Sequence, residues 1–153
     1  MRKDLRKDLR KLVRKAIRVN SRDIENLDKE VFLKCKTIAK HIKRNKISLE
    51  EAIKLPAVII GGLLWNKRKI GITRFLKPPI APKLEKALNK VGVIGKKVGE
   101  NTVGKCAEVD CANYLLLNCR SNYEVSDIKF STPYRPRTSE IIETCENCKK
   151  TFI

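Results

Sequence analysis

The chain has 153 residues, 42% of them hydrophobic, which suits one globular domain or one domain with an appendage. Its 35 Lys and Arg outnumber its 17 Asp and Glu, and the formal net charge of +18 favours contact with polyanions or anionic membrane surfaces. The longest apolar run, Leu55–Trp65, is too short for a membrane-spanning helix. No apolar stretch follows the charged N-terminus, so a secretory signal peptide is not expected.

The first predicted element covers residues 2–19. Apolar side chains recur there at every fourth position, at Leu5, Leu9, Val13 and Ile17. This period predicts an amphipathic helix with a narrow apolar stripe on a strongly basic body. Two roles are open for it: the stripe packs on the rest of the protein, or the helix makes transient contact with a membrane surface or with nucleic acid.

A second helix is predicted over residues 23–44. It follows a break at Asn20 and Ser21, two residues whose side chains can cap the start of a helix. Its apolar residues keep helical spacing, and Cys35 belongs to that apolar face, so we expect Cys35 in the core. His41 is the one histidine of the chain, and we expect a surface or capping role for it rather than metal binding.

A third helix is predicted to open at Ser48, because Ser48 and Glu51 have the spacing of a capping box. Pro56 and the pair Gly61 and Gly62 are expected to interrupt or end this helix. The N-terminal part of the chain is therefore expected to be helical throughout.

A domain boundary is predicted near residue 80. Residues 66–82 are rich in proline and are interpreted as a linker, with one short strand over 70–76. This divides the chain into a basic helical segment, 1–80, and a second domain, 81–153.

The second half of the chain predicts an α/β fold, or an α+β fold if its sheet is mostly antiparallel. Glycines and prolines divide it into short elements. In chain order we expect a helix over 81–91, a hairpin of strands at 93–94 and 98–103, a helix over 106–119, a strand over 125–130, a basic loop over 131–137 and a last short helix starting at Cys145.

Two cysteine motifs carry the chemical information. Cys106 is followed two positions later by Glu108, and Cys145 and Cys148 form a C-x-x-C pair. Three thiolates suit Zn²⁺, and a set of three protein ligands leaves a fourth position for water, as in catalytic zinc sites. Both motifs are predicted near helix N-termini, where exposed amide groups stabilise thiolates. Glu108 is near enough to act on the water without being a ligand.

The run G-K-C-A-E-V-D-C-A-N-Y-L-L, followed by the C-x-x-C pair, resembles the zinc-dependent cytidine-deaminase superfamily, and most of all the YwqJ-type deaminase domains of bacterial polymorphic toxins. The resemblance covers residues 90–153. It implies a small sheet flanked by the two cysteine-bearing helices, with Cys106, Cys145 and Cys148 as zinc ligands. It also implies that Glu108 moves protons between a water molecule, the ring nitrogen and the leaving amine.

The sequence departs from the family pattern at two points. Thr144 stands where the family has proline, but threonine can also cap a helix. The strands that follow the second cysteine motif in the family are absent, so N-terminal segments would have to complete the sheet.

The expected substrate is a cytosine base in a single strand of DNA or RNA, because the charge favours a polyanion and the base must leave its stack to reach the metal. The resemblance suggests Asn101 as a contact to the sugar. Tyr134, together with Tyr123, could stack on a base. Arg135 and Arg137 could bind phosphate, and Arg120 is a further cation that could offset the negative charge of three thiolates.

The resemblance also implies a biological setting. The chain would be the toxin end of a larger protein that a bacterium secretes or delivers, and it would act in the cytoplasm of a target cell. An acidic immunity protein would neutralise it.

Several alternatives stay open. Cys106, Cys111, Cys145 and Cys148 could form a structural four-cysteine zinc knuckle, or the cysteines could serve redox chemistry. The protein could be a non-enzymatic, zinc-stapled nucleic-acid-binding module, or it could deaminate free nucleosides or nucleotides. It could also be a membrane-active basic peptide, formed by residues 1–45, that is fused to a small domain.

Overall fold

A central hairpin organises the fold. The computed structural model describes residues 2–45, 55–119 and 122–152, with the side chains of 23–44, 55–119 and 122–152. Strands β1 (Ile59–Leu64) and β2 (Lys67–Ile72) pair antiparallel, with Ile59 opposite Ile72 and Leu64 opposite Lys67. Every residue of β1 is buried, because the strand has neighbours on both edges and on both faces.

The other edge of β1 pairs with strands from the C-terminal part of the chain. Here β5 (Lys129–Phe130) lies opposite Gly62 and Leu63, and β6 (Tyr134–Arg135) meets β1 at Ile59. Strand β7 (Glu140–Ile141) pairs with β6 and completes a five-stranded antiparallel sheet. Residues 59–72 thus contribute two strands to the sheet.

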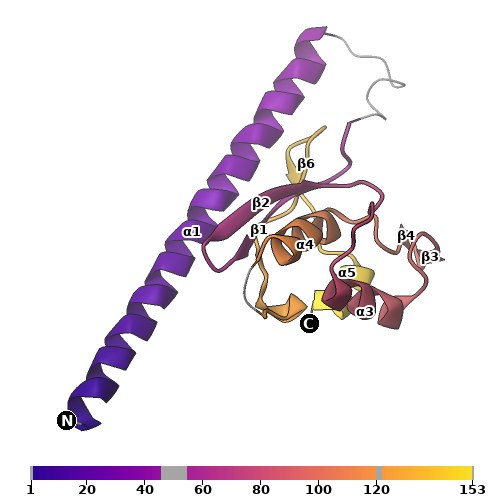
Figure 1. Ribbon diagram of the computed structural model, residues 1–153. Coiled ribbons are helices and arrows are strands. Elements are labelled where there is room, and N and C mark those ends of the chain that lie inside the picture. Colours follow the sequence, from indigo (N-terminus) through magenta and orange to yellow (C-terminus); the bar gives the residue numbers. More distant parts are fainter. Residues whose placement is uncertain (1, 46–54, 120–121, 153) are drawn as a thin grey trace.

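Helix α1 (Arg2–Asn45) covers one face of the sheet (Figure 1). Leu27 and Val31 of α1 are fully buried and pack against Ile59 and Leu63 of β1. At Gly61 the two elements approach so closely that a Cβ atom would lie 2.5 Å from Leu27 Cγ. The missing side chain of Gly61 leaves room for Leu27, and this fit fixes where α1 crosses the sheet.

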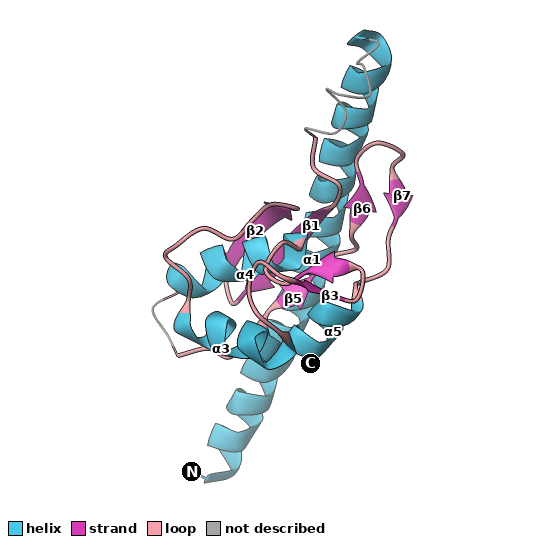
Figure 2. Ribbon diagram, turned by 90° about the vertical axis from the view of Figure 1, so that its right-hand side faces the viewer, coloured by secondary structure: helices cyan, strands magenta, loops and turns pink. Residues whose placement is uncertain are grey.

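Helix α4 (Ala107–Leu117) covers the opposite face, so the sheet lies between α1 and α4 (Figure 2). A Cβ atom at Gly71 would lie 2.5 Å from both the Ala107 carbonyl oxygen and Cys111 Sγ, so only glycine allows this approach. Beside α4, α3 (Pro82–Val91) and α5 (Glu146–Phe152) share one apolar cluster with it, which includes Leu88, Leu115 and Cys148.

Two small elements complete the fold. A two-stranded hairpin of β3 (Lys97–Val98) and β4 (Asn101–Thr102) follows α3 and lies apart from the main sheet. A single 3-10 turn, η1 (Val125–Asp127), precedes β5. Within the described ranges, no helix is long and apolar enough to cross a membrane.

Several predictions for the second half are confirmed and others need correction. Helices α3, α4 and α5 lie where the spacing predicts them, and the fold is mixed α/β with an antiparallel sheet. The predicted hairpin exists, but its strands are β3 and β4 and not 93–94 and 98–103. The predicted strand over 125–130 is half 3-10 turn, and the predicted loop 131–137 contains β6. Strands β5 and β6 depend on pairing with β1, which local sequence does not encode.

Two predictions for the first half are wrong. Helix α1 runs through Asn20 and Ser21 without a break, because the cost of such residues inside a helix is small compared with the gain from a continuous helix. The N-terminal segment is also not all-helical, since β1 and β2 occupy 59–72. The helix predicted to open at Ser48 begins outside the described residues. The division near residue 80 stays a prediction, although β1 and β2 pack directly on α4.

Candidate metal centre and cleft

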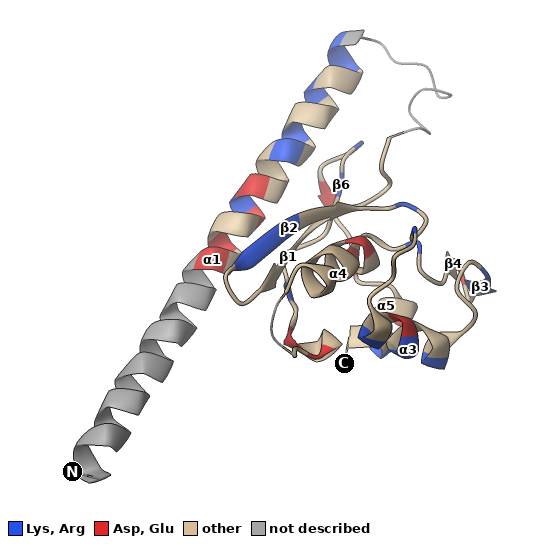
Figure 3. Cartoon of the chain, in the orientation of Figure 1, with Lys and Arg blue, Asp and Glu red and all other residues tan. Residues whose placement is uncertain are grey.

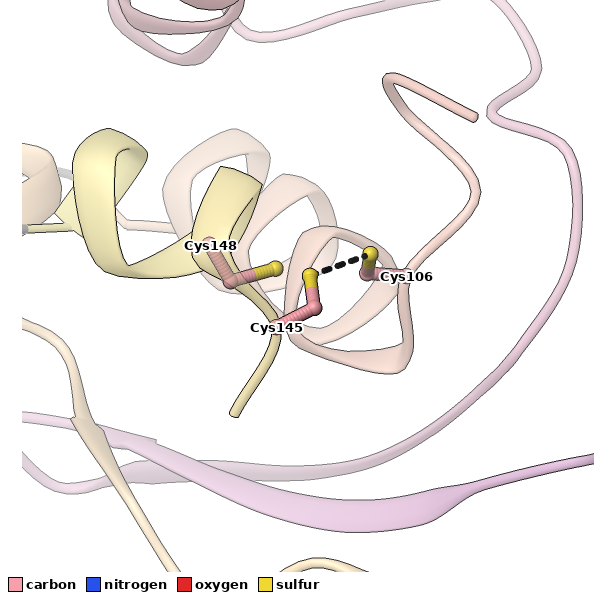
Figure 4. A group of neighbouring side chains, drawn as sticks. All are labelled: Cys106, Cys145 and Cys148. Carbon is pink, nitrogen blue, oxygen red and sulfur yellow. Dashed lines mark hydrogen bonds between the residues drawn. The ribbon is translucent and has the colours of Figure 1, made fainter. Parts of the chain in front are cut away.

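Three cysteines from two helices converge on one point (Figure 4). Cys106 immediately precedes α4, Cys145 immediately precedes α5, and Cys148 lies in the first turn of α5. Their Sγ atoms all lie within 4.8 Å of one another, and those of Cys106 and Cys145 are 3.3 Å apart. The three sulfurs are therefore close enough to hold one metal ion, as the two sequence motifs predict.

The start of α4 fixes Cys106. Its backbone is extended, and its carbonyl oxygen accepts hydrogen bonds from the amides of Val109 (3.1 Å) and Asp110 (3.3 Å). This is the geometry of a helix N-cap, at which free amide groups and the positive end of the helix dipole favour a thiolate. The carbonyl oxygen of Cys145 likewise accepts from the amide of Lys149 at 3.0 Å, which ties Cys145 to α5.

The thiols influence one another strongly. Hydrogen bonds from Cys106 and Cys148 lower the pKa of Cys145 to about 2, and the same contact with Cys145 raises the pKa of Cys106 to about 12. Contacts with Cys106 and Cys145 also raise the pKa of Cys148. The contacts among the three thiols therefore favour ionisation of Cys145 over its two neighbours. Three thiolates at these distances require a positive charge between them, so the donor set fits a metal ion.

Glu108 lies beside this cluster in the first turn of α4. Only 5% of the residue is exposed, and the thiol of Cys148 donates a hydrogen bond to its Oε2 at 3.6 Å. Burial raises the pKa of the Glu108 carboxyl, because the charged form loses its hydration. No ion pair of Glu108 occurs among the described side chains, and its backbone amide and the Cys148 thiol are the groups that offset the burial. A buried carboxyl with a raised pKa next to a metal site is well suited to move a proton.

A cleft of about 940 Å³ opens onto Cys106, Glu108 and Cys145. Its walls come from the β3–β4 hairpin, from the ends of β1 and β2, and from the segment between β6 and α5. Basic and acidic side chains both line it: Lys97, Lys105, Arg135, Lys149 and Lys150 against Glu100, Glu108, Glu143 and Glu146. Among the described side chains, Lys and Arg are not gathered at the cleft alone, since they also lie on the coloured part of α1, on β2 and on α3 (Figure 3).

The predicted substrate contacts fall in different places. Asn101 and Arg135 line the cleft and are exposed, so both can meet a ligand there. Tyr134 is half-buried, and its ring packs against that of Phe32 of α1, with 5.4 Å between the ring centroids. Arg137 is exposed but does not line the cleft, and Arg120 lies outside the described residues.

The remaining cysteines lie elsewhere. Cys111 is fully buried, and its thiol donates to the carbonyl oxygens of Lys69 (3.3 Å) and Ile60 (3.5 Å). It therefore faces the sheet, away from the other three cysteines. This rules out the zinc knuckle formed by Cys106, Cys111, Cys145 and Cys148. Cys35 is buried in α1, as expected, and its thiol donates to the Arg135 carbonyl oxygen at 3.4 Å. His41 is exposed.

Sequence reasoning missed two polar residues that hold the site together. Asn147, between the two cysteines of the C-x-x-C pair, is buried, and its Nδ2 donates to the carbonyl oxygens of Val98 (3.1 Å) and Asn101 (3.2 Å). It thereby fastens the β3–β4 hairpin to α5. The sequence does hold a signal for this role. Asn147 lies between two candidate ligands, Cys145 and Cys148, which fix its backbone, so its side chain is held in a defined place.

Asp110 is the second of these residues. Its carboxylate accepts from the amide of Ile72 at 3.1 Å and from Arg74 Nε at 2.6 Å. Arg74 is more than half exposed, so the ion pair itself adds little stability, but the buried Asp110 ties the end of β2 to the first turn of α4.

Comparisons with protein-family models, with curated proteins and with solved structures find no match to this chain.

Proposed function

We propose that the protein is a zinc-dependent deaminase that converts cytosine to uracil in single-stranded nucleic acid. The observation that carries this proposal is Glu108, a carboxyl group that is buried next to three convergent cysteines and opens onto a cleft. A metal centre with a purely structural role has no need of a buried carboxyl with a raised pKa. The resemblance of the cysteine motifs to the deaminase superfamily supports the same reaction.

Zinc is the proposed metal, because three thiolates suit its borderline-soft character. Cys106, Cys145 and Cys148 would hold it, and Cys111 lies too deep under the sheet to take the fourth position. Bound zinc would supply a Lewis acid and would lower the pKa of a bound water molecule. The cleft on the side of Cys106 and Cys145 leaves room for the water and the substrate.

Glu108 would carry the protons of the reaction. Cytosine gains the oxygen of one water molecule at C4 and loses its amino group as ammonia, so two protons must pass from the water to the base. In this role Glu108 first accepts a proton, then donates it to the ring nitrogen, and a second transfer completes the leaving amine. Its buried position beside Cys148 places the carboxyl where it can take up a proton and release it again.

A single strand is the proposed substrate, because a base must leave its stack to reach a site this deep. The cleft exceeds what one base needs, and Arg135 and Lys105 lie on its walls as candidate phosphate contacts. Asn101, exposed on the β3–β4 hairpin, is the candidate for the sugar. By the same resemblance we propose a toxin that acts in the cytoplasm of a target cell and is neutralised by an acidic partner.

The test compares the parent protein with Glu108→Gln. Both would be loaded with zinc and incubated with single-stranded DNA and with RNA, and uracil would be measured in the product. We expect uracil with the parent alone and a loss of at least about a hundredfold in the variant, the usual scale for a group that transfers protons. Zinc content should be equal, because Glu108 is not one of the three sulfur ligands.

Uracil at equal rates from both proteins would rule out the role of Glu108. If zinc is bound but neither DNA nor RNA is converted, the same assay would be repeated with free cytidine and with adenine substrates. Failure with all of these would leave a zinc-stapled binding module as the better description.

A further inference from the structure

Phe75 is a large aromatic side chain left exposed beside the candidate site. It lies just beyond β2, and 60% of the residue is accessible to solvent. The ammonium group of Lys105 lies 4.8 Å from the centre of its ring. Lys105 lines the cleft and directly precedes Cys106, whereas Phe75 itself is not a lining residue. The ring therefore lies against a residue of the cleft wall, just outside the lining.

The backbone around Phe75 is firmly tied to the metal centre. The amide of the preceding residue, Arg74, donates to the Lys105 carbonyl oxygen at 3.2 Å, and its side chain pairs with the buried Asp110 at 2.6 Å. Asp110 also accepts from the amide of Ile72 at 3.1 Å. Phe75 thus follows a segment whose backbone and side chains are hydrogen-bonded to the start of α4. That part of the chain carries Cys106 and Glu108. An aromatic ring exposed at an anchored position is pre-organised for a flat ligand.

We infer that Phe75 and Lys105 form a platform on which a base adjacent to the target base stacks, with Lys105 contacting the neighbouring phosphate. This rests on the proposed class of substrate. Base–aromatic stacking with a nearby cation is the usual means of holding a single strand, and it tolerates any base because every base has a flat face. Phe75 lies outside the cleft lining, so it suits a flanking base and not the base that reacts.

Trp65 provides a matched control within the same hairpin. It occupies the β1–β2 turn, is 64% exposed and is also a large aromatic residue. The turn is at the other end of the hairpin from Phe75, about 20 Å away for six residues of strand. Trp65 and Phe75 are thus both large aromatic residues of similar exposure, and they differ in their distance from the cleft.

The first experiment measures the affinity for a short, fluorescently labelled single-stranded oligonucleotide by anisotropy. All proteins carry zinc, and Glu108→Gln serves as the background so that the ligand is not converted. We expect Phe75→Ala to raise Kd about tenfold, equivalent to about 1.4 kcal/mol. Phe75→Trp should retain affinity, and Trp65→Ala should leave it unchanged. Equal Kd values for Phe75→Ala and its background would overturn the inference.

A second experiment observes the contact directly. Trp65 is the single tryptophan of the chain, so the double variant Trp65→Phe, Phe75→Trp carries its only indole at the platform. Oligonucleotide should quench its emission, and a free mononucleotide, which has no flanking base, should not at the same concentration. Equal quenching by both, or by neither, would contradict a flanking-base site.

The two proposals can fail separately. If the parent forms no uracil but Phe75→Ala still weakens oligonucleotide binding, the deaminase proposal fails and the platform stands. If uracil forms in the parent and Phe75→Ala binds as tightly as its background, the platform alone is refuted.

Discussion

Cys106 and Cys111 belong to the same helical segment but have different chemistry. Cys106 precedes α4 and faces two other thiols at the cleft. Cys111 faces the sheet, where burial, as the largest cause, raises the pKa of its thiol to about 12. A thiol ionises only as the pH approaches its pKa, so Cys111 stays neutral and unreactive at neutral pH. Spacing on a helix decides which of the two can be a ligand.

Alkylation should separate these cysteines. In the folded protein at neutral pH we expect Cys111 to resist iodoacetamide whether or not the metal is present, because it is both neutral and buried. Cys145 is partly exposed and its pKa is lowered by its cysteine neighbours, so it should react after chelation and be protected before it. Mass spectrometry of peptides would report each site.

Cys119 is the internal control for that experiment. It lies just after α4, is partly exposed and should react in both states. If Cys111 were alkylated as fast as Cys119 under native conditions, the burial of Cys111 described above would be wrong.

At the scale of elements, the β3–β4 hairpin depends on one amide side chain. Asn147 donates from α5 to two carbonyl oxygens of the hairpin, at Val98 and Asn101. The hairpin carries Asn101 to the cleft, and Asn147 lies between two of the candidate metal ligands. Asn147 therefore links this wall of the cleft to the part of the candidate metal centre that lies on α5.

Asn147→Ala should loosen the hairpin without removing the metal. The variant leaves two acceptors without their partner, and we expect the free energy of unfolding to fall by about 1–2 kcal/mol. Backbone amides of residues 97–102 should exchange hydrogen faster, and metal content should stay at the parent level. Hydrogen-exchange mass spectrometry and metal analysis provide the two measurements.

Asn118→Ala is a suitable control, because Asn118 is exposed and donates only within its own helix, to Tyr114. It should leave exchange over 97–102 unchanged. Unchanged exchange in Asn147→Ala as well would show that the hairpin does not depend on that side chain.

The sequence predicts some elements well because their signals are local. The positions of α3, α4 and α5 follow from apolar spacing and from prolines and glycines at their ends, and the motif of Cys106 and Cys145 follows from residue type alone. The prediction that Gly61 and Gly62 interrupt or end a helix is wrong. They lie inside β1, where α1 and α4 approach the strand from its two faces and leave no room for a side chain. This need for glycine arises from tertiary packing, which the local sequence does not reveal. The roles of Asn147 and Asp110 depend on distant partners in the same way.

At the scale of the whole molecule, α1 is part of the core. Leu27 and Val31 bury one face of β1, and Asp28 accepts from the amide of Thr132 at 2.6 Å. The segment 23–44 therefore covers a face that would otherwise expose Ile59 and Leu63. These contacts favour a packing role for this part of the helix over that of a detachable peptide.

Removal of residues 1–45 should abolish the stable fold. The exposed apolar face of β1 has no other cover among the described elements, so we expect aggregation and loss of a cooperative thermal transition. Removal of residues 1–22 alone keeps the contacts of 23–44 and should leave a folded monomer. Size-exclusion chromatography and circular dichroism would compare the three proteins. A monomeric, cooperatively unfolding chain without residues 1–45 would contradict this account.

The metal centre also has a topological consequence. Cys106 and Cys145 are 39 residues apart, and a metal ion held between them closes the intervening chain into a loop. That loop contains β5, β6 and β7, the strands that complete the sheet beside β1. Closing the loop reduces the number of conformations open to these strands before they pair, so bound metal lowers the entropic cost of assembling the sheet. A metal ion at this site would thus act as a cross-link in the folding of the protein.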